Sequence, residues 1–113
     1  MDLAVILKTL GDDCRLRILG LLLQRELCVC DIESVLGLSQ ANASRHLSKM
    51  KSSGILSSRK TAQWVYYNID NRFSELHPEF VESLKAEFKK NSVFKKDNVK
   101  LKTLKKNSEG LKC

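Results

Sequence analysis

Cys28 and Cys30, two cysteines separated by a single residue, are the side chains of this chain best suited to chemistry. Thiolates are preferred ligands of soft metal ions and are also readily oxidised. Side chains at i and i+2 diverge on a regular helix, but they can converge when the first lies just before the helix begins. A helix N-terminus also favours the thiolate over the thiol. The pair therefore indicates a soft-ion site, and two small buried hydrophobic side chains are the alternative interpretation.

Length and composition limit the classes of protein that this chain can belong to. Its 113 residues, 42% of them hydrophobic, are enough for one domain, and its core is small enough for burial against a second subunit to be expected. The longest apolar run, "ILGLLL", is too short to span a membrane, and the N-terminus has no secretory pattern. The four cysteines do not form a disulfide framework, so we expect a cytoplasmic protein with reduced thiols.

Basic residues are concentrated in two segments, and the net charge is +7. Residues 39–63 carry five basic and no acidic side chains, and residues 91–113 carry seven lysines against two acidic residues. The remainder is net negative by three charges. Charge concentrated in a short internal segment indicates a polyanion as the partner.

Capping signals predict two helices before the thiol pair. Apolar residues fall on one helical face of residues 3–10, which stop at Gly11. Asp12 or Asp13 is the expected N-cap of a second, largely buried helix.

A helix-turn-helix is predicted directly after the thiol pair. A short helix over residues 30–36 ends at Gly37, and Ser39 is the expected N-cap of the next helix, which runs to about Ser53 and ends at Gly54. Two short helices joined by a glycine-containing turn are typical of this motif.

A β-hairpin and a last helix follow. The segment "ILSSRKTAQWVYYNI" predicts two strands with a turn near Thr61–Ala62 and with Arg59 and Lys60 close to the tip. Pro78 suits the first turn of a final helix with an apolar stripe. We expect residues 1–90 to form the domain, and residues 91–113 to form a basic tail that either extends the last helix or is disordered.

The helix after the turn has two distinct faces. Ala43, Leu47 and Met50 are expected to face the core, while short polar side chains and two cations point outward. A major groove suits this arrangement, because small polar groups reach base edges while cations hold phosphates; a solvated polar face is the alternative. We expect DNA contacts from Ser39, Gln40, Asn42, Ser44, Arg45, His46, Lys49, Arg59 and Lys60, with His46 half-buried and orienting a phosphate.

Four motifs, "LGDDCRLRIL", "ELCVCDI", "LGLSQANASRHLSKMKSSGIL" and "RKTAQWVYYNI", resemble the ArsR/SmtB family of metal-responsive repressors in order and spacing, over about residues 2–90. The resemblance implies a mainly α-helical fold with a small β-hairpin, the winged helix-turn-helix. It also implies a homodimer built from the first and last helices. Such a dimer is expected to bind an inverted-repeat operator DNA and to release it when a metal or metalloid binds.

The segment "ELCVCD" resembles the effector site of the arsenite-responsive branch, which implies that Cys28 and Cys30 bind As(III) or Sb(III). That branch has a third cysteine where this chain has Glu33, so the third thiolate comes from Cys113, from Cys14 or from a small-molecule thiol. The cadmium branch implies Cd(II) or Pb(II) as the alternative ion, but it uses cysteines from an N-terminal arm that does not precede Met1 here.

The expected mechanism is allosteric derepression. Ligation of the thiols moves the start of the helix over residues 30–36, which packs on the DNA-reading helix. Alternatives on the same fold are a thiol redox switch, through Cys28–Cys30 or Cys30–Cys113, and an architectural DNA binder with inert cysteines. An enzyme is not expected, because the sequence has no C-x-x-C motif and no visible nucleophile–base pair.

Overall fold

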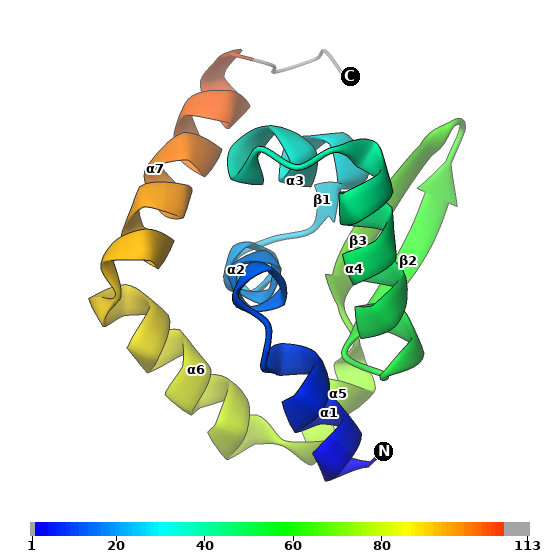
Figure 1. Cartoon of the computed structure of the whole chain (residues 1–113), viewed down its shortest axis with the longest axis vertical. Helices are drawn as coiled ribbons and strands as arrows, with labels where there is room; N and C mark the ends of the chain where they lie inside the picture. The colour runs from blue at the N-terminus through cyan, green and yellow to red at the C-terminus, as the bar shows by residue number, and fades with distance from the viewer. Residues whose placement is uncertain (1, 108–113) are drawn as a thin grey trace.

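The computed structural model describes the backbone of residues 2–107 and the side chains of residues 2–104 (Figure 1). Within these limits the elements are α1 (Leu3–Leu10), α2 (Asp13–Leu22), β1 (Leu27–Cys28), α3 (Val29–Leu36), α4 (Gln40–Ser52), β2 (Leu56–Thr61), β3 (Trp64–Ile69), α5 (Asn71–Leu76), α6 (Pro78–Lys90) and α7 (Ser92–Asn107). None of the helices in the described part of the chain has the length and apolar character that a bilayer crossing requires.

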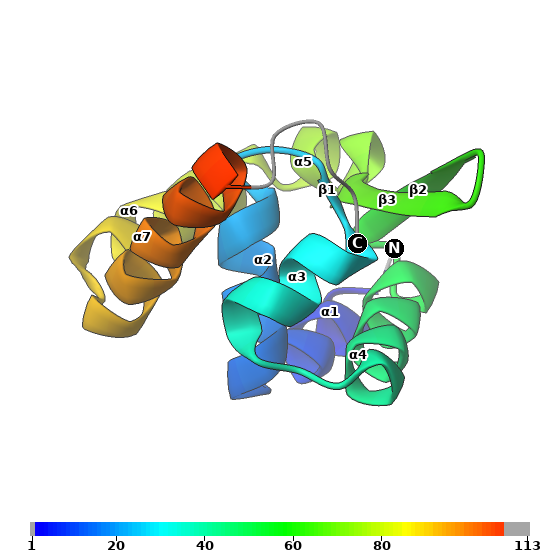
Figure 2. The ribbon, with the colours of Figure 1, turned by 90° about the horizontal axis from the view of Figure 1, so that it is seen from above.

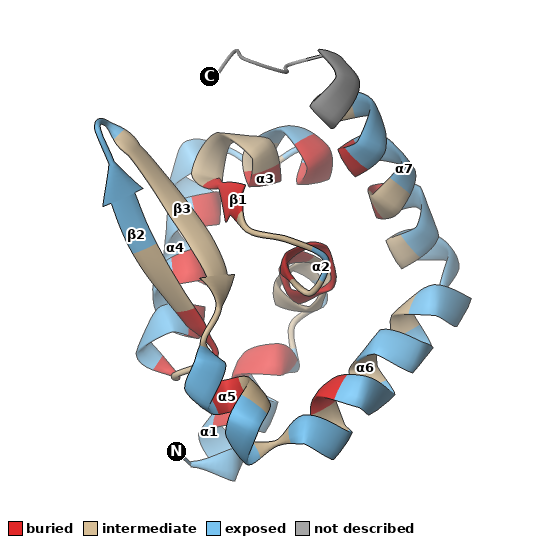
Figure 3. Cartoon of the chain, turned by 180° about the vertical axis from the view of Figure 1, so that it is seen from behind, coloured by how far each residue is buried: buried red, intermediate tan, exposed pale blue. Residues whose placement is uncertain are grey.

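Helix α2 is the centre of the molecule. Figure 1 shows it almost end-on with the other elements around it, and Figure 3 shows that much of its surface is buried. Its second half is buried over the five consecutive residues Ile18 to Leu22. Asp12, one of the two predicted candidates, is its N-cap, with a side chain that accepts a hydrogen bond from the backbone N–H of Arg15. A helix whose second half is buried in this way serves as the scaffold on which the other elements are positioned.

The predicted helix-turn-helix is confirmed in α3 and α4. Gly37 ends α3 with a positive φ of 67°, a left-handed conformation that glycine adopts without steric cost. The Ser39 side chain then accepts a hydrogen bond from the N–H of Asn42 and begins α4. The three side chains predicted to face the core from α4 are fully buried: Ala43, Leu47 and Met50.

The sheet has three strands in the order β1-β3-β2, all antiparallel, where the sequence predicts two. The hairpin of β2 and β3 has its turn after Thr61, with Ala62 at a φ of 55°, close to the predicted position. The extra strand, β1, consists of Leu27 and Cys28, which pair with Tyr67 and Tyr66 of β3. The first cysteine of the thiol pair is therefore part of the sheet that carries the hairpin.

The C-terminal segment contains two helices separated by Asn91, whose backbone is extended. Helices α6 and α7 lie on the opposite side of α2 from the hairpin (Figure 2), and α7 contacts both α2 and α3. Residues 92–107 are thus helical, and residues 108–113, including Cys113, lie outside the described part.

Two contacts dock α7 on α2. A Cβ at Gly20 would lie 3.2 Å from a ring carbon of Phe94, so the absence of a side chain at Gly20 permits the close approach. Arg17 donates two hydrogen bonds to Asp97, at 3.0 and 2.8 Å, and the Asp97 side chain is almost fully buried. The α7 helix is therefore fixed by apolar packing and by a bidentate ion pair.

Candidate DNA interface and thiol site

The outward face of α4 carries the polar side chains expected to contact DNA. Of the nine predicted positions, eight are exposed: Ser39, Gln40, Asn42, Ser44, Arg45, Lys49, Arg59 and Lys60. The first six of these belong to α4 and its N-cap, where the first-turn N–H groups favour anions. Arg45 donates a hydrogen bond to Asn42 at 3.3 Å, which aligns its guanidinium along this face. The arrangement provides hydrogen-bonding groups and cations on one continuous surface.

The ninth position, His46, is buried rather than half-buried, with 6% of its surface exposed. Burial lowers the pKa of its imidazole and so favours the neutral ring, while the nearby Asp12 carboxylate partly opposes this shift. Its Nδ1 lies 3.3 Å from the Arg15 guanidinium. His46 therefore contacts α2 from the inner side of α4, and this position does not present its side chain to a DNA groove.

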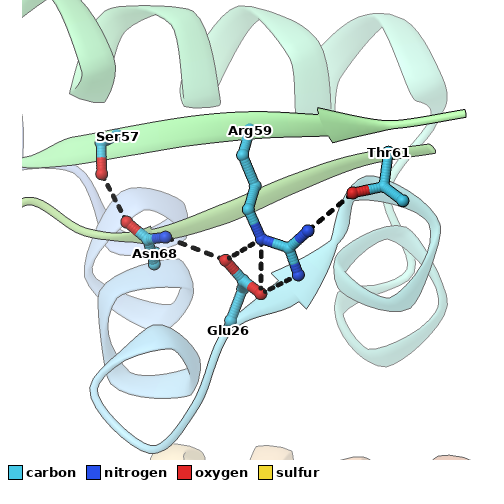
Figure 4. Close-up of polar contacts among 5 residues, drawn as sticks. All are labelled: Glu26, Ser57, Arg59, Thr61 and Asn68. Atoms are coloured by element: carbon cyan, nitrogen blue, oxygen red, sulfur yellow. Dashed lines mark hydrogen bonds and ion pairs between the residues drawn. The ribbon is translucent and has the colours of Figure 1, made fainter.

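The two basic residues near the hairpin tip have different surroundings. Lys60 is exposed, whereas the Arg59 guanidinium binds the Glu26 carboxylate through Nη2 at 2.6 Å and Nε at 2.9 Å (Figure 4). Arg59 also donates to Thr61 at 2.7 Å and lies 4.6 Å above the Tyr66 ring. Its predicted contact with DNA would therefore compete with an ion pair within the chain.

Glu26 binds side chains of both hairpin strands, β2 and β3, through hydrogen bonds. It accepts from Arg59 of β2 and, at 2.9 Å, from the side chain of Asn68 of β3, which also accepts a hydrogen bond from Ser57 (Figure 4). These interactions, Arg59 first and Asn68 second, lower the pKa of Glu26. No expectation for Glu26 came from the sequence, because its partners Arg59 and Asn68 lie more than thirty positions later, although an acidic residue two positions before Cys28 was a usable signal.

The thiol pair spans the junction of β1 and α3. Cys28 has an extended backbone and is the N-cap of α3, while Cys30 lies in the first turn. The expectation that the first cysteine lies just before the helix is confirmed, since α3 begins at Val29. Cys28 is buried, with 1% exposed, whereas Cys30 is half-buried.

The described side chains do not identify a third ligand for an ion bound by Cys28 and Cys30. Glu33, one helical turn after Cys30, is half-buried. Among residues 2–104, the side chains that form a group of three potential metal ligands are Asp12, Cys14 and His46, and neither Cys28 nor Cys30 belongs to it. The sequence left Cys14 as a candidate third thiolate beside Cys28 and Cys30, whereas the structure groups Cys14 with Asp12 and His46. The other candidate, Cys113, is outside the described residues.

Sequence comparison relates this arrangement to known regulators. The model of the family described as "Bacterial regulatory protein, arsR family" matches residues 12–58, from the N-cap of α2 into β2. The arsenic resistance transcriptional regulator ArsR1 of Pseudomonas putida is 42% identical over 87 residues, 75% of this chain and 62% of the relative. The cadmium resistance regulatory protein CadC homolog of Staphylococcus aureus is 44% identical over 72 residues, 63% of this chain and 60% of the relative. The matched part is therefore less than two thirds of either relative.

Two further relatives are matched over more than two thirds of their own length. The arsenic resistance transcriptional regulator ArsR2 of Pseudomonas putida is 37% identical over 94 residues, 82% of this chain and 79% of the relative. The homodimeric winged helix-turn-helix domain Mb0332 of Mycobacterium bovis superposes with a TM-score of 0.64 at 31% identity, covering 74% of this chain and 78% of that domain. ArsR2 is named as a transcriptional regulator, and Mb0332 is described as a possible ArsR-family transcriptional regulator. This chain, with its winged helix-turn-helix, belongs to the ArsR family of bacterial regulatory proteins.

Proposed function

We propose that this protein is a metalloid-responsive transcriptional repressor. It binds operator DNA as a homodimer and releases it when the thiolates of Cys28 and Cys30 capture As(III) or Sb(III). Residues 1–90 carry the DNA-binding and dimerisation functions, and residues 91–113 contribute α7 and a third thiolate from Cys113.

One observation carries this proposal: Cys28 belongs both to the sheet of the hairpin and to the start of the helix-turn-helix. It pairs with Tyr66 of β3 and is the N-cap of α3, which packs against α4. A ligand that pulls on this residue therefore acts on the hairpin through the paired strands and on α4 through the single helix α3. Coupling free energies between two sites are typically about 1–3 kcal/mol, roughly 5- to 150-fold in affinity, which is enough to clear a promoter.

The exposed face of α4 supports operator binding. Its polar side chains are suited to base edges, and Arg45 and Lys49 are suited to phosphates. Lys60 extends the basic surface to the hairpin, the wing of the motif. We expect α4 to enter the major groove and the wing to lie along the neighbouring backbone.

Exposed apolar side chains on the outer helices support a homodimer. Leu3, Val5 and Leu7 of α1 and Val93 and Val99 of α7 are exposed, and their burial against a second copy would remove apolar surface from water. The related domain from Mycobacterium bovis is described as homodimeric. A two-fold dimer would present two α4 helices to half-sites about one DNA turn apart.

The choice of ion follows from the ligand chemistry and from the relatives. Thiolates select soft ions, and ArsR1 and ArsR2 are named as arsenic resistance regulators. Because another relative is named for cadmium resistance, Cd(II) is the alternative inducing ion, together with the similarly soft Pb(II). Because α3 carries Glu33 rather than a third thiol, the remaining sulfur is assigned to Cys113 or to a small-molecule thiol.

Fluorescence anisotropy on the DNA upstream of the protein's own gene tests the proposal. Reduced wild-type protein should release this DNA as arsenite is added, whereas Cys28→Ser and Cys30→Ser should stay bound at the same arsenite concentrations. Ser34→Ala, an exposed position on the same helix, is the matched control and should release normally. Normal release by Cys28→Ser would remove this thiol from the effector site.

A thiol redox switch is the second candidate, because Cys28 and Cys30 are only two positions apart at the junction of β1 and α3. In this case, hydrogen peroxide would oxidise two thiols to a disulfide. The thiols would lose two electrons and two protons, and the peroxide would be reduced to water. This oxidation would release DNA without any metalloid. Titration of the reduced protein with arsenite and, separately, with hydrogen peroxide distinguishes the candidates. Release by peroxide but not by arsenite would favour the redox switch and contradict the metalloid proposal.

A further inference from the structure

A second group of metal-ligating side chains lies away from the thiol pair, where α2 begins beneath α4. The ligand atoms of Asp12, Cys14 and His46 all lie within 4.8 Å of one another. Asp12 and Cys14 are half-buried and His46 is buried. The first two residues belong to the start of α2 and the third is 32 positions later on the DNA-reading helix, so the fold rather than the local sequence brings them together.

We propose that Asp12, Cys14 and His46 bind a divalent transition-metal ion of the Zn²⁺ class, and that this ion ties α4 to α2. One nitrogen, one sulfur and one oxygen are a donor set that Zn²⁺ accepts in tetrahedral coordination. Because Asp12 and Cys14 are partly exposed, water can supply the fourth ligand. The site is separate from the proposed metalloid site in residues, in elements and in the class of ion.

The surroundings of each ligand suit this chemistry. A histidine nitrogen is the commonest metal ligand among protein side chains, and His46 is buried where α4 faces α2. On ligation the Cys14 thiol gives up its proton to water, because the thiolate is the form of cysteine that binds the ion. Two anionic ligands, carboxylate and thiolate, then balance the divalent charge.

One oxygen of Asp12 is already engaged, and its hydrogen bonds orient the carboxylate. Asp12 Oδ1 accepts from the N–H of Arg15 at 3.0 Å as the helix cap, which leaves Oδ2 for an ion. The Arg15 side chain is held by the carbonyl oxygen of Thr9 at 2.6 Å, and its Nη1 lies 3.3 Å from Nδ1 of His46. This long contact is the one that an ion at Nδ1 would replace, whereas an ion at Nε2 would leave it in place.

A chain with a single cysteine tests the proposal cleanly. In the full-length protein carrying Cys28→Ser, Cys30→Ser and Cys113→Ser, Cys14 is the remaining thiol. Co²⁺ is the probe, because thiolate-to-cobalt charge transfer and ligand-field absorption report sulfur ligation and coordination number directly. We expect one Co²⁺ per chain, with both absorption features. Adding Cys14→Ser should abolish the charge-transfer band.

Two further variants in the same background test the other ligands. Asp12→Asn keeps an oxygen for the helix cap, and His46→Gln keeps a polar side chain of similar reach. Each should weaken Co²⁺ binding by more than the roughly 10- to 100-fold that loss of an outer-shell partner costs. Circular dichroism verifies that each variant is folded before titration.

Two outcomes would overturn the proposal. One is a folded Cys14-only chain that shows no charge-transfer band with Co²⁺. The other is a band that survives both Asp12→Asn and His46→Gln with unchanged affinity, which would reduce the site to a lone thiol. Since this chain lacks the thiols of the metalloid site, either failure leaves the proposed function untouched.

Discussion

Arg59, on the first strand of the wing, is ion-paired with Glu26, which precedes Cys28 by two residues. The pair joins Arg59 Nη2 to Glu26 Oε1 at 2.6 Å, and the Tyr66 ring lies beneath the guanidinium. Because Tyr66 is also the register partner of Cys28, the wing and the thiol strand are connected by backbone pairing and by side chains at the same position. A basic residue expected to bind DNA thus participates in the link between sensor and wing.

The basic residues should differ in their contribution to the salt dependence of DNA binding. Lys49→Ala and Lys60→Ala should each lower the slope of log affinity against log salt by about 0.9, the value for one phosphate contact. Arg59→Ala should lower it by less, because Glu26 already neutralises its guanidinium. Anisotropy titrations at several salt concentrations measure the slopes. An equal loss for Arg59→Ala and Lys60→Ala would mean that Arg59 leaves Glu26 when DNA binds.

Glu26→Gln should weaken the response to arsenite more than it weakens DNA binding. Glutamine keeps the shape of the side chain but loses the charge that holds Arg59, so strain at Cys28 is transmitted less effectively to the wing. The ratio of operator affinities without and with arsenite should therefore fall. Glu75→Gln, an exposed position on α5, is the matched control and should keep the wild-type ratio. An unchanged ratio in Glu26→Gln would show that coupling runs through α3 and α4 alone.

Elements set by local signals could be predicted from the sequence. Asp12, Gly37 and Ser39 cap or end their helices through contacts within four residues, so residue type and position identify Gly37 and Ser39 and limit the cap of α2 to Asp12 or Asp13. The hairpin was found for the same reason, since its turn is local. In contrast, β1 has only two residues, and its strand conformation depends on pairing with β3, about forty positions later.

The same distinction applies to the candidate sites. The outward face of α4 follows from helical periodicity, so its exposed side chains were identified correctly. The burial of His46 and its approach to Cys14 depend on how α4 packs on α2, which no local pattern encodes. The pairing of Arg59 with Glu26 likewise joins residues 33 positions apart.

Asp97→Ala should destabilise the protein through loss of the ion pair between α7 and α2. The carboxylate is buried and fixed by two hydrogen bonds from Arg17, whereas the Arg17 side chain is 32% exposed and can regain water. The expected loss is therefore about 1–3 kcal/mol of unfolding free energy, below the cost for a fully buried pair. Urea denaturation measures it, with Glu87→Ala, an exposed position on α6, as the control. A loss no greater than that of the control would show that apolar packing alone docks α7.

Stability should decrease in acid partly through Glu26 and Asp70. The pKa of Glu26 lies below its ordinary value of 4.5 because of Arg59 and then Asn68, and the pKa of Asp70 lies below 3.8 because it accepts a hydrogen bond from the Arg72 N–H. A carboxylate with a lowered pKa binds fewer protons in the folded than in the unfolded chain. Its contribution is therefore complete above the ordinary value and is lost as the pH falls through the folded value.

Urea midpoints between about pH 6 and pH 3 check this dependence. The double variant Glu26→Gln and Asp70→Asn should lose less stability over this interval than the wild type. Both carboxylates are close to the surface, so the difference should be modest and should shrink at high salt. A double variant with the same acid dependence as the wild type would assign the effect to other groups.

X-ray absorption on the arsenite-loaded protein should identify the third sulfur donor. Without added thiol, the reduced wild-type protein should show three sulfur neighbours around arsenic, because trivalent arsenic prefers three thiolates. Cys113→Ser should show two sulfur neighbours and one oxygen, and adding a small-molecule thiol should restore the third sulfur. Three sulfur neighbours in Cys113→Ser without added thiol would instead require Cys14, and this would place the thiol in competition with the Asp12 and His46 site.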